Sequence, residues 1–420
     1  MRRLSATTVY YASEVWLSFA FSVTWTVSAV YFVQEVGMNP LELVLVGTVM
    51  ELAIVLFEVP TGVVADTYSR RLSLVIGWIV MGIGLVLAGA VASVPAVLAG
   101  WAVWGLGYTF TSGADQAWIT DEVGADRVGR VFARGQQLGY VGALAGTGVS
   151  VAVASVDLSA AVVVGGVLAA AFGAFAALTM PEHGFARRAA SDRGSALHEL
   201  RTTAVTGGRF VRAQPVLLLI LGITFFAGAS TESFDRLWQA QLITDIGLPG
   251  FGSLDPVVWF GLFGAVSLLI GLVASQLLVR RFERVGQERL ARLLFVFTLV
   301  QVVAVLVFAL GGNLALAAGG MWLYYLTRSL IEPVYRTWLN EQITDSSVRA
   351  TVISMTGQSD AIGQVAGGPG LGALGTVFSL RTALLAGGAL LAPALALYAR
   401  AIRHGGAEPE LEELRATGSL

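Results

Sequence analysis

The sequence predicts an all-α membrane protein in which twelve transmembrane helices form two pseudo-symmetric six-helix bundles. Three observations support this prediction. Hydrophobic residues make up 55% of the 420-residue chain and charged residues only 13%, whereas about a quarter of the residues in a soluble domain are charged. Apolar runs of about twenty residues, long enough to cross a bilayer, recur twelve times. A sequence repeat also relates the two halves of the chain.

The apolar runs set the boundaries of the expected elements. They lie near 10–33, 41–61, 72–92, 96–117, 134–156, 159–180, 214–239, 257–279, 291–311, 314–338, 350–376 and 381–402. We expect an N-terminal six-helix bundle over 1–180 and a C-terminal six-helix bundle over 214–403. The Arg-rich segment 181–213 is expected to be a cytoplasmic linker whose part from Ser195 to Arg212 could form an amphipathic helix on the membrane. The acidic tail 404–420 is expected to be disordered and cytoplasmic.

The basic residues indicate the orientation in the membrane. All 26 are arginines, and 23 of them fall in segments that twelve spans would place on the same side as the N-terminus. Loops rich in arginine stay on the cytoplasmic side. We therefore expect both termini in the cytoplasm and a multi-pass protein in the plasma (inner) membrane of a bacterium. The first apolar run is too long for the core of a signal peptide and is interpreted as the first span.

The two halves contain an internal repeat. Residues 127–148 superpose on 349–370 at a fixed offset of 222. The matches are Arg127 with Arg349, Gly135 with Gly357, Gln136 with Gln358, Gly146 with Gly368 and Gly148 with Gly370. The triplet Ile-Thr-Asp at 119–121 recurs at 343–345 when a two-residue gap is allowed. Such repeats are typical of secondary transporters.

A charged turn separates the second apolar run from the third. Gly62, Asp66, Arg70 and Arg71 follow the spacing G-x-x-x-D-x-x-x-R-R. A glycine allows two helices to approach closely, and an aspartate can accept hydrogen bonds from an arginine or a helix N-terminus. The two arginines hold the turn on the cytoplasmic side. The same residues are compatible with a basic loop that only sets orientation.

This stretch resembles the signature loop between the second and third helices of the major facilitator superfamily of secondary transporters. Ser69 stands where the family usually has glycine, and Thr67 where it often has a basic residue. The resemblance implies two six-helix halves, with spans one, four, seven and ten around a central cavity. It also implies that the loop is a conformational latch between the halves, a role that Asp66, Arg70 and Arg71 would inherit.

Charged residues within the spans are candidates for coupling. A charge at the bilayer centre costs about 2.5–3.5 kcal/mol, so it normally faces a cavity or a partner. We take as proton-coupling candidates the carboxylates Glu51, Asp115, Glu232, Asp235 and Asp360. No histidine lies in a predicted span, so a proton carrier has to be a carboxylate, which burial can bring to titrate near neutral pH.

Structural pairing is the alternative for the other charges in the spans. Glu14 and Glu58 lie near the inner ends of their spans, where loop arginines could pair with them. Arg328 and Glu332 are four residues apart and could pair along one helix face.

Aromatic residues at mid-depth indicate the substrate class. The cavity candidates are Trp25, Tyr108, Phe225, Phe226, Tyr324 and Tyr325, together with Arg328. An aromatic cavity with few charges suits an apolar or cationic organic molecule better than a sugar or a phosphate ester. Packing between helices is an equally good explanation for any one of these residues.

Other classes of function are disfavoured. The chain has no cysteine, and its histidines, His183, His198 and His404, lie in polar segments, so no metal site and no cofactor are expected. A Walker motif and an H-E-x-x-H motif are missing from the sequence, which argues against an ATP-driven pump and against an intramembrane enzyme. The net charge of −2 argues against a nucleic-acid partner.

Together, these features and the family resemblance predict a transporter that works by alternating access and exports hydrophobic, drug-like molecules in exchange for protons. Its expected partners are the small-molecule substrate, protons and the lipid bilayer, and we expect a monomer. Span five has Gly139, Gly142, Gly146 and Gly148, as in proton-coupled exporters of the family, but it lacks their proline. A proton-coupled symporter that imports a metabolite, and a membrane receptor that does not transport, therefore stay open as alternatives.

Overall fold

The computed structural model describes residues 3–185, 208–249, 257–282, 287–343, 345 and 348–416, and every regular element among them is helical. The chain divides into two compact units. Unit 1 comprises Met1–His198 and Ile243–Ala265, and unit 2 comprises Glu199–Leu242 and Val266–Leu420. The stretch 243–265, which the sequence assigns to the C-terminal bundle, thus groups with unit 1. Residues 186–207 of the expected linker lie outside the described residues, while 208–213 are helical.

Helices α1 to α8 belong to unit 1. They are α1 (Ala6–Trp25), α2 (Ser28–Gln34), α3 (Pro40–Thr67), α4 (Arg70–Ala90), α5 (Val94–Thr111), α6 (Ala114–Val123), α7 (Ala125–Ala154) and α8 (Leu158–Thr179). Side chains that accept hydrogen bonds from the first free N–H groups fix several starts. Asn39 and Glu42 form a capping box on α3, Ser69 caps α4, and Asp157 caps α8. Local sequence therefore determines where these helices begin.

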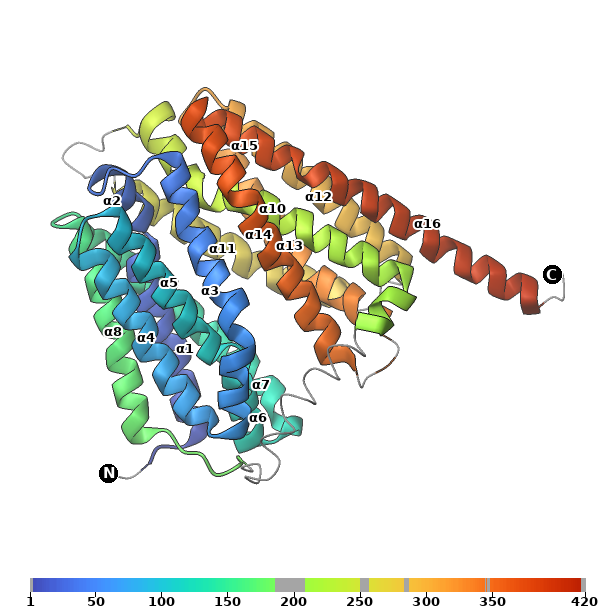
Figure 1. Cartoon of the computed structure of the whole chain (residues 1–420), viewed down its shortest axis with the longest axis horizontal. Helices are drawn as coiled ribbons and strands as arrows, with labels where there is room; N and C mark the ends of the chain where they lie inside the picture. Colours follow the sequence, from blue (N-terminus) through green and yellow to red (C-terminus); the bar gives the residue numbers. More distant parts are fainter. Residues whose placement is uncertain are drawn as a thin grey trace. The chain divides into compact units, whose positions relative to one another are not determined.

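The elements from α10 onward form the second half of the chain. They are α10 (Pro215–Gln241), η2 (Leu242–Ile246), α11 (Val257–Phe282), α12 (Gln287–Leu310), α13 (Leu314–Gln342), α14 (Arg349–Val377), α15 (Leu380–Ala389) and α16 (Leu391–Ala416). Figure 1 shows α16 continuing toward the C-terminus. It includes residues 404–416, for which the sequence predicted disorder.

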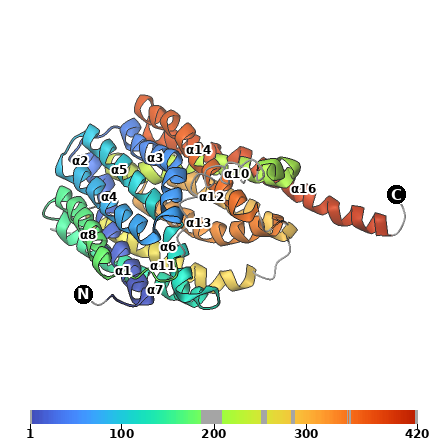
Figure 2. The ribbon, with the colours of Figure 1, turned by 60° about the horizontal axis from the view of Figure 1, so that its bottom comes forward.

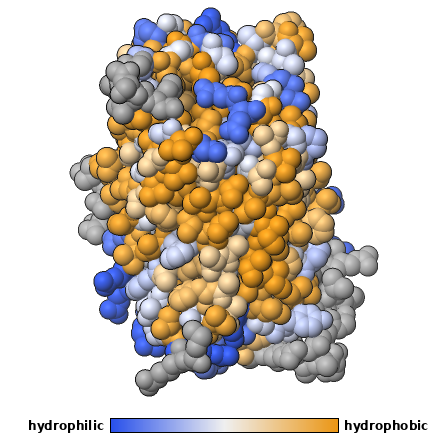
Figure 3. Space-filling model, turned by 90° about the vertical axis from the view of Figure 1, so that its left-hand side faces the viewer, coloured by the Kyte–Doolittle hydropathy of each residue, from blue (hydrophilic) through white to orange (hydrophobic). Residues whose placement is uncertain are grey.

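Nine of the expected spans are occupied, within the described residues, by helical stretches long and apolar enough to cross a membrane. Helices α5, α13 and α14 stand at the other three expected positions, 96–117, 314–338 and 350–376. Helices α13 and α14 contain glycine and charged residues, and α5 contains glycine, tryptophan and tyrosine but no charged residue; these residues lower the mean hydropathy of the three helices. Figure 3 shows a broad hydrophobic zone across the middle of the visible face, with hydrophilic residues gathered at both ends. The chain is a multi-pass membrane protein.

The two units repeat one pattern of helix packing. In unit 1, α1 packs on α7 and α8, and α4 lies between α5 and α8 (Figures 1 and 2). In unit 2, α10 packs on α14 and α16, and α12 packs on α13 and α16. Adding the sequence offset of 222 to the first residue of α7 gives 347, close to the start of α14 at Arg349.

Glycines allow the crossings α1–α7 and α10–α14 to bring backbone against backbone. A Cβ atom placed on Gly142 of α7 would lie 3.0 Å from the carbonyl carbon of Val15 in α1. On Gly363 of α14 it would lie 2.9 Å from the carbonyl carbon of Phe225 in α10. The close contact expected of these Gly-rich helices is present at both positions. At Gly148, by contrast, a Cβ would meet no described atom within 4 Å.

The fourth expected span is shorter than the apolar run that predicted it. Helix α5 ends at Thr111, and α6 begins at Ala114. Gly113 between them has a φ of 71°, in the left-handed region that glycine adopts readily. Asp115 therefore lies in the first turn of a separate helix, where its charge is favoured by the helix dipole.

Candidate functional site

The main charged group of unit 2 joins α10 to α13. Nη1 of Arg328 lies 2.7 Å from both carboxylate oxygens of Asp235 and donates hydrogen bonds to them. The side chains are 47% and 29% exposed, respectively. A proton-coupling candidate and a cavity candidate are thus direct partners.

This pair corrects the expected bond between Arg328 and Glu332. Glu332 instead accepts a 2.5 Å hydrogen bond from Nε of Arg336, one turn further along α13. Both arginines are four residues from Glu332, so the helical spacing allowed either pair. Arg328 reaches Asp235 on α10, which leaves Glu332 to Arg336.

Two other coupling candidates lie on α10 and α14 of the same unit. Glu232 is 2% exposed and lies 3.5 Å from Nε of Arg236. Its buried Oε2 accepts no hydrogen bond from the described residues. Asp360 accepts a 2.8 Å hydrogen bond from Nε2 of Gln364 and lies where α14 crosses α10 at Gly228. The carboxylate of Glu232, buried without a hydrogen-bond donor to Oε2, is costly to keep charged.

An aromatic cluster surrounds the position of Asp235 along α10. The rings of Phe234 and Tyr324 stack with centroids 3.9 Å apart, and Tyr325 contacts both of them edge-on. Trp238 contacts Tyr325 at 6.4 Å. Phe234 and Trp238 were not among the cavity candidates, although Phe234 is the sequence neighbour of Asp235 and Trp238 lies one turn beyond it.

The other two aromatic candidates of unit 2 pack differently. Phe225 and Phe226 form an edge-to-face pair at 5.4 Å. Phe226 also packs against the hydrophobic core formed by buried residues such as Ile223 and Val334. For Phe226 the structure thus supports packing between helices, the alternative reading of these residues.

Unit 1 contains a second aromatic cluster, on α1 and α5. Trp104 stacks on Tyr108 at 5.6 Å and meets Trp25 edge-on at 5.9 Å. Phe21 stacks on Trp25, and Trp101 packs beside Trp104. Trp25 and Tyr108, the two candidates predicted here, are 45% and 40% exposed.

Carboxylates accompany this cluster. Glu58 on α3 accepts a 3.4 Å hydrogen bond from Oγ of Ser112, four residues after Tyr108. Glu51 lies two turns earlier on the same face of α3 and is half-buried. Asp115 accepts a hydrogen bond from the N–H of Gln116 at the start of α6. Glu14 lies against Gly135 and Gly139, where α1 crosses α7.

The charged turn between α3 and α4 is bonded within unit 1. Arg70 pairs with Asp121 of α6 and donates a 2.8 Å hydrogen bond to the carbonyl of Ala117. The N–H of Arg71 donates to Glu182 at 2.9 Å, and Oγ of Ser69 donates to the same carboxylate at 2.7 Å.

The other half of the predicted latch makes fewer contacts. Asp66 is exposed. A Cβ atom on Gly62 would meet no described atom within 4 Å, so the close helix approach expected there is not found among the described residues. The acids that bond the arginines, Asp121 and Glu182, were not among the candidates. The repeated Ile-Thr-Asp triplet, which ends at Asp121, was the available signal.

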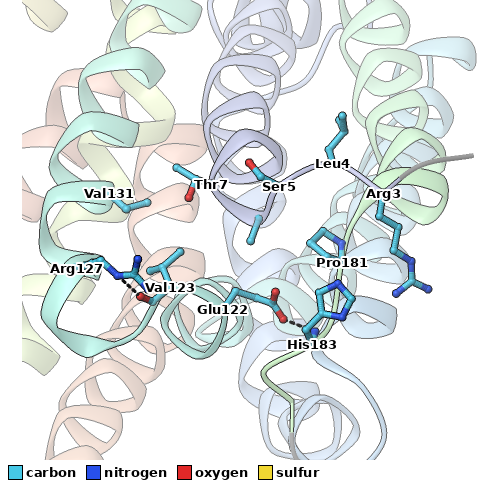
Figure 4. Close-up of a pocket in the computed structure, with 11 residues that line it drawn as sticks. Arg3, Leu4, Ser5, Thr7, Glu122, Val123, Arg127, Val131, Pro181 and His183 are labelled. Carbon is cyan, nitrogen blue, oxygen red and sulfur yellow. Dashed lines mark hydrogen bonds between the residues drawn. The ribbon is translucent and has the colours of Figure 1, made fainter.

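A pocket of about 470 Å³ lies at this end of unit 1 (Figure 4). Arg3, Arg127 and His183 contribute basic side chains to its lining. Glu122 accepts hydrogen bonds from the N–H groups of His183 and Gly184, at 2.5 and 2.8 Å. These bonds tie the chain after α8 to α6.

Comparison with known proteins identifies relatives of this fold. The family model of the Major Facilitator Superfamily matches residues 13–359. An uncharacterized MFS-type transporter of Bacillus subtilis (strain 168), YxaM, is 29% identical over 98 residues, which are 23% of this chain and 25% of the relative. The match therefore spans a quarter of that relative's length.

Solved transporter structures share the fold. The nucleoside transporter NupG superposes with a TM-score of 0.75 at 15% identity, over 95% of this chain and 99% of that one. A bacterial homologue of the human lysosomal transporter Spinster, in an inward-facing and unoccupied conformation, gives a TM-score of 0.72 at 15% identity, over 95% and 96% of the two chains. The TM-scores show a common fold, and at identities this low they show the fold alone.

Proposed function

The chain belongs to the Major Facilitator Superfamily, and from this premise we propose that it exports hydrophobic, drug-like molecules in exchange for protons. Family membership makes it a secondary transporter that spans the membrane several times. Its direction, substrate and coupling ion belong to the proposal. So do the twelve spans, the alternating access between two halves, the monomeric state, and the plasma (inner) membrane with both termini in the cytoplasm.

One observation carries the proposal: carboxylates and an aromatic cluster share the same two helices of unit 2. Asp235 lies between Phe234 and Trp238 along α10, and Arg328 follows Tyr324 and Tyr325 by one turn on α13. Phe234 and Tyr324 are buried, whereas Trp238 and Tyr325 are half-buried and offer aromatic area to an apolar or cationic molecule. A carboxylate at the same place can hold either a proton or a positive partner. Competition between these two states is what exchange of a substrate for protons requires.

Protonation gives the exchange a physical step. Ionised Asp235 accepts both hydrogen bonds from Arg328. A proton on Asp235 removes its charge and weakens this pair, so that Arg328 and α13 are released from α10. Glu232 and Asp360, on α10 and α14, are the next candidates to receive the proton. Glu51 and Asp115 are the corresponding candidates in unit 1.

The charged turn is the proposed latch. Arg70 and Arg71 are held by Asp121 and Glu182, which supports a fixed position for the turn at the end of α3. The proposal assigns the exposed carboxylate of Asp66 to the contact that forms and breaks during transport, with Gly62 one turn before it.

The test measures the accumulation of a lipophilic cationic dye in cells, with and without a proton uncoupler. Wild-type protein should lower accumulation, and the uncoupler should abolish this effect. Asp235→Asn and Asp66→Ala should each slow efflux about tenfold or more, since coupling free energies of ~1–3 kcal/mol correspond to such factors. Glu332→Gln is the matched control, because its carboxylate pairs with Arg336 on the exposed face of α13.

The outcomes separate the alternatives. Equal efflux by wild type, Asp235→Asn and Asp66→Ala contradicts the proposal. Dye or metabolite accumulation that an inward proton gradient increases indicates import by symport. A receptor would show no flux in either direction, and its phenotype would tolerate neutral substitution of every coupling candidate.

A further inference from the structure

A groove of about 650 Å³ runs along α7 beside the start of α1. Tyr11 of α1 contributes to its lining, and α7 contributes Arg130, Ala133, Arg134, Gln137, Leu138 and Val141. The α7 residues are spaced three, one, three, one and three positions apart, so they form one stripe along the helix. The groove is therefore a continuous surface on one helix face.

The stripe changes from basic to apolar along its length. Arg130 and Arg134 lie at one end of the stripe, near the start of α7 where the charges of this helix are found, and Val141, 62% exposed, lies at the other end of the stripe, near the middle of α7. Eleven positions of helix correspond to about 16 Å, roughly half the thickness of the ~30 Å hydrocarbon core. With α7 across the membrane, the arginines lie near the polar boundary and Val141 lies near the middle of the bilayer.

Neither arginine of the stripe has an acidic partner among the described residues. Arg134 lies over the ring of Tyr11, 5.9 Å from its centroid, and both arginine side chains are exposed. Asp126 is one turn before Arg130, yet no ion pair joins them. By contrast, Arg70 is bound to Asp121, and Arg127 donates to the carbonyl of Val123. Two adjacent guanidinium groups are thus available to an anion.

We propose that this groove binds an anionic phospholipid, with its phosphate between Arg130 and Arg134 and an acyl chain along Leu138 and Val141. Guanidinium groups bind phosphate oxygens through paired hydrogen bonds, and basic residues at the membrane surface attract anionic lipids. Tyrosine is suited to the same interfacial depth. A free phosphate would satisfy the arginines alone, whereas the exposed apolar end of the stripe matches a lipid tail. This inference is independent of the transported substrate.

The experiment measures binding of fluorescent phosphatidylglycerol to the purified full chain in a neutral detergent. Arg130→Gln/Arg134→Gln should weaken binding about thirtyfold, which corresponds to ~1 kcal/mol for each arginine near an anionic surface. Arg3→Gln/Arg127→Gln removes the same charge from the same end of unit 1 and should change affinity by less than about threefold. Arg130→Lys/Arg134→Lys keeps the charge and should retain most of the binding.

Two further arms distinguish the source of the phosphate and guard against misfolding. Val141→Asn should weaken phosphatidylglycerol binding, and glycerol phosphate should compete with the lipid only weakly. Thermal unfolding of each variant in the neutral detergent should match that of the wild type. Equal affinity of the glutamine variant and the control variant overturns the proposal. So does equal binding of phosphatidylcholine, or competition by glycerol phosphate as strong as by the lipid.

Discussion

Asp235 and Arg328 form a pair that is suited to open. Their side chains are 29% and 47% exposed. Because charged groups in a membrane protein avoid hydrocarbon, the proposed function places this exposed area in a water-filled cavity. Water screens such a pair, and exposed ion pairs contribute only about 0–1 kcal/mol. Glu232, only 2% exposed, has no comparable access to water. A proton arriving from solution therefore reaches Asp235 more easily.

A double-mutant cycle tests how weakly this pair is held. With Asp235→Asn and Arg328→Gln, we expect a coupling free energy of about 1 kcal/mol or less in detergent unfolding, while either single substitution slows proton-dependent transport about tenfold or more. The cycle of Glu332→Gln with Arg336→Gln is the control, because that pair is 60% and 73% exposed and should leave transport intact. A coupling above about 3 kcal/mol would mark Asp235–Arg328 as a structural ion pair instead.

Asp157 provides a pH-dependent contribution to stability outside the spans. Its carboxylate accepts hydrogen bonds from the N–H of Ala160 and from Oγ of Ser159, at 2.9 and 2.8 Å, and these bonds lower the pKa of Asp157 below its ordinary value of 3.8. A lowered pKa in the folded state stabilises the protein above the ordinary value, and this stabilisation is lost as pH falls through the folded value.

Asp157→Ala should therefore lower the apparent unfolding temperature at pH 7. The difference from wild type should shrink as pH falls from about 4, where the carboxylate of the unfolded chain takes up its proton, through the lower pKa of the folded carboxylate. Asp157→Asn is the matched control, because asparagine also caps helices but has no carboxylate to titrate. A difference for alanine that stays constant down to pH 3 would contradict the assignment.

At least one helix pair in each unit is in direct main-chain contact. At α1–α7 and α10–α14 the glycines bring main chains into contact, so there is no flexible side chain that could yield to an added methyl group. Close packing of this kind replaces the hydrophobic effect as the source of helix association in a bilayer.

Adding one methyl group at these crossings should be costly. Gly142→Ala and Gly363→Ala should each destabilise the protein by about 1–3 kcal/mol through overpacking, measured by unfolding in detergent. Gly148→Ala on α7 and Gly370→Ala on α14 are matched controls, because a Cβ there meets no described atom within 4 Å. These two should be neutral or slightly stabilising, since alanine favours helix over glycine. Equal losses at all four positions would mean that backbone propensity, and not contact, determines the effect.

The sequence predicted positions along helices better than partners between them. The Gly-rich faces of α7 and α14 were identified because spacing within one helix shows which residues share a face. The bond from Arg328 to Asp235 was missed because these residues are 93 positions apart, and helical spacing favoured Glu332. The run 96–117 was interpreted as one helix because hydropathy does not detect the left-handed turn at Gly113. Asp121 and Glu182 were missed because they lie outside the apolar runs.

At the scale of the whole molecule, three of the twelve expected membrane crossings, those of α5, α13 and α14, remain a prediction. Helices α5, α13 and α14 are less apolar than the nine candidate spans of the described residues. In the proposed arrangement α13 faces the substrate cavity and α5 carries an aromatic cluster with exposed faces. Lower hydropathy is expected for helices that face water or substrate instead of lipid.

Cysteine labelling in intact cells tests these three crossings. The chain has no cysteine, so a single introduced thiol reacts without background. Ser93→Cys, Gly312→Cys and Phe378→Cys should react with an impermeant maleimide from outside, and Ala125→Cys and Asp345→Cys should react only after the cells are opened. Reaction of positions 93 and 125 from the same side would remove α5 from the spans. The same result at 312 and 345 would remove α13, and at 345 and 378 it would remove α14.

The glycine-lined crossings also provide an internal standard for spectroscopy. Spin labels attached to the outer faces of α1 and α7 should keep one narrow distance distribution whether the carrier is loaded, empty or protonated, because the two main chains touch at Gly142. Any broadening or splitting seen with other label pairs can then be attributed to the motion of one helix pair against another. The motif that makes the helices inseparable thereby gives a fixed length against which transport movements are measured.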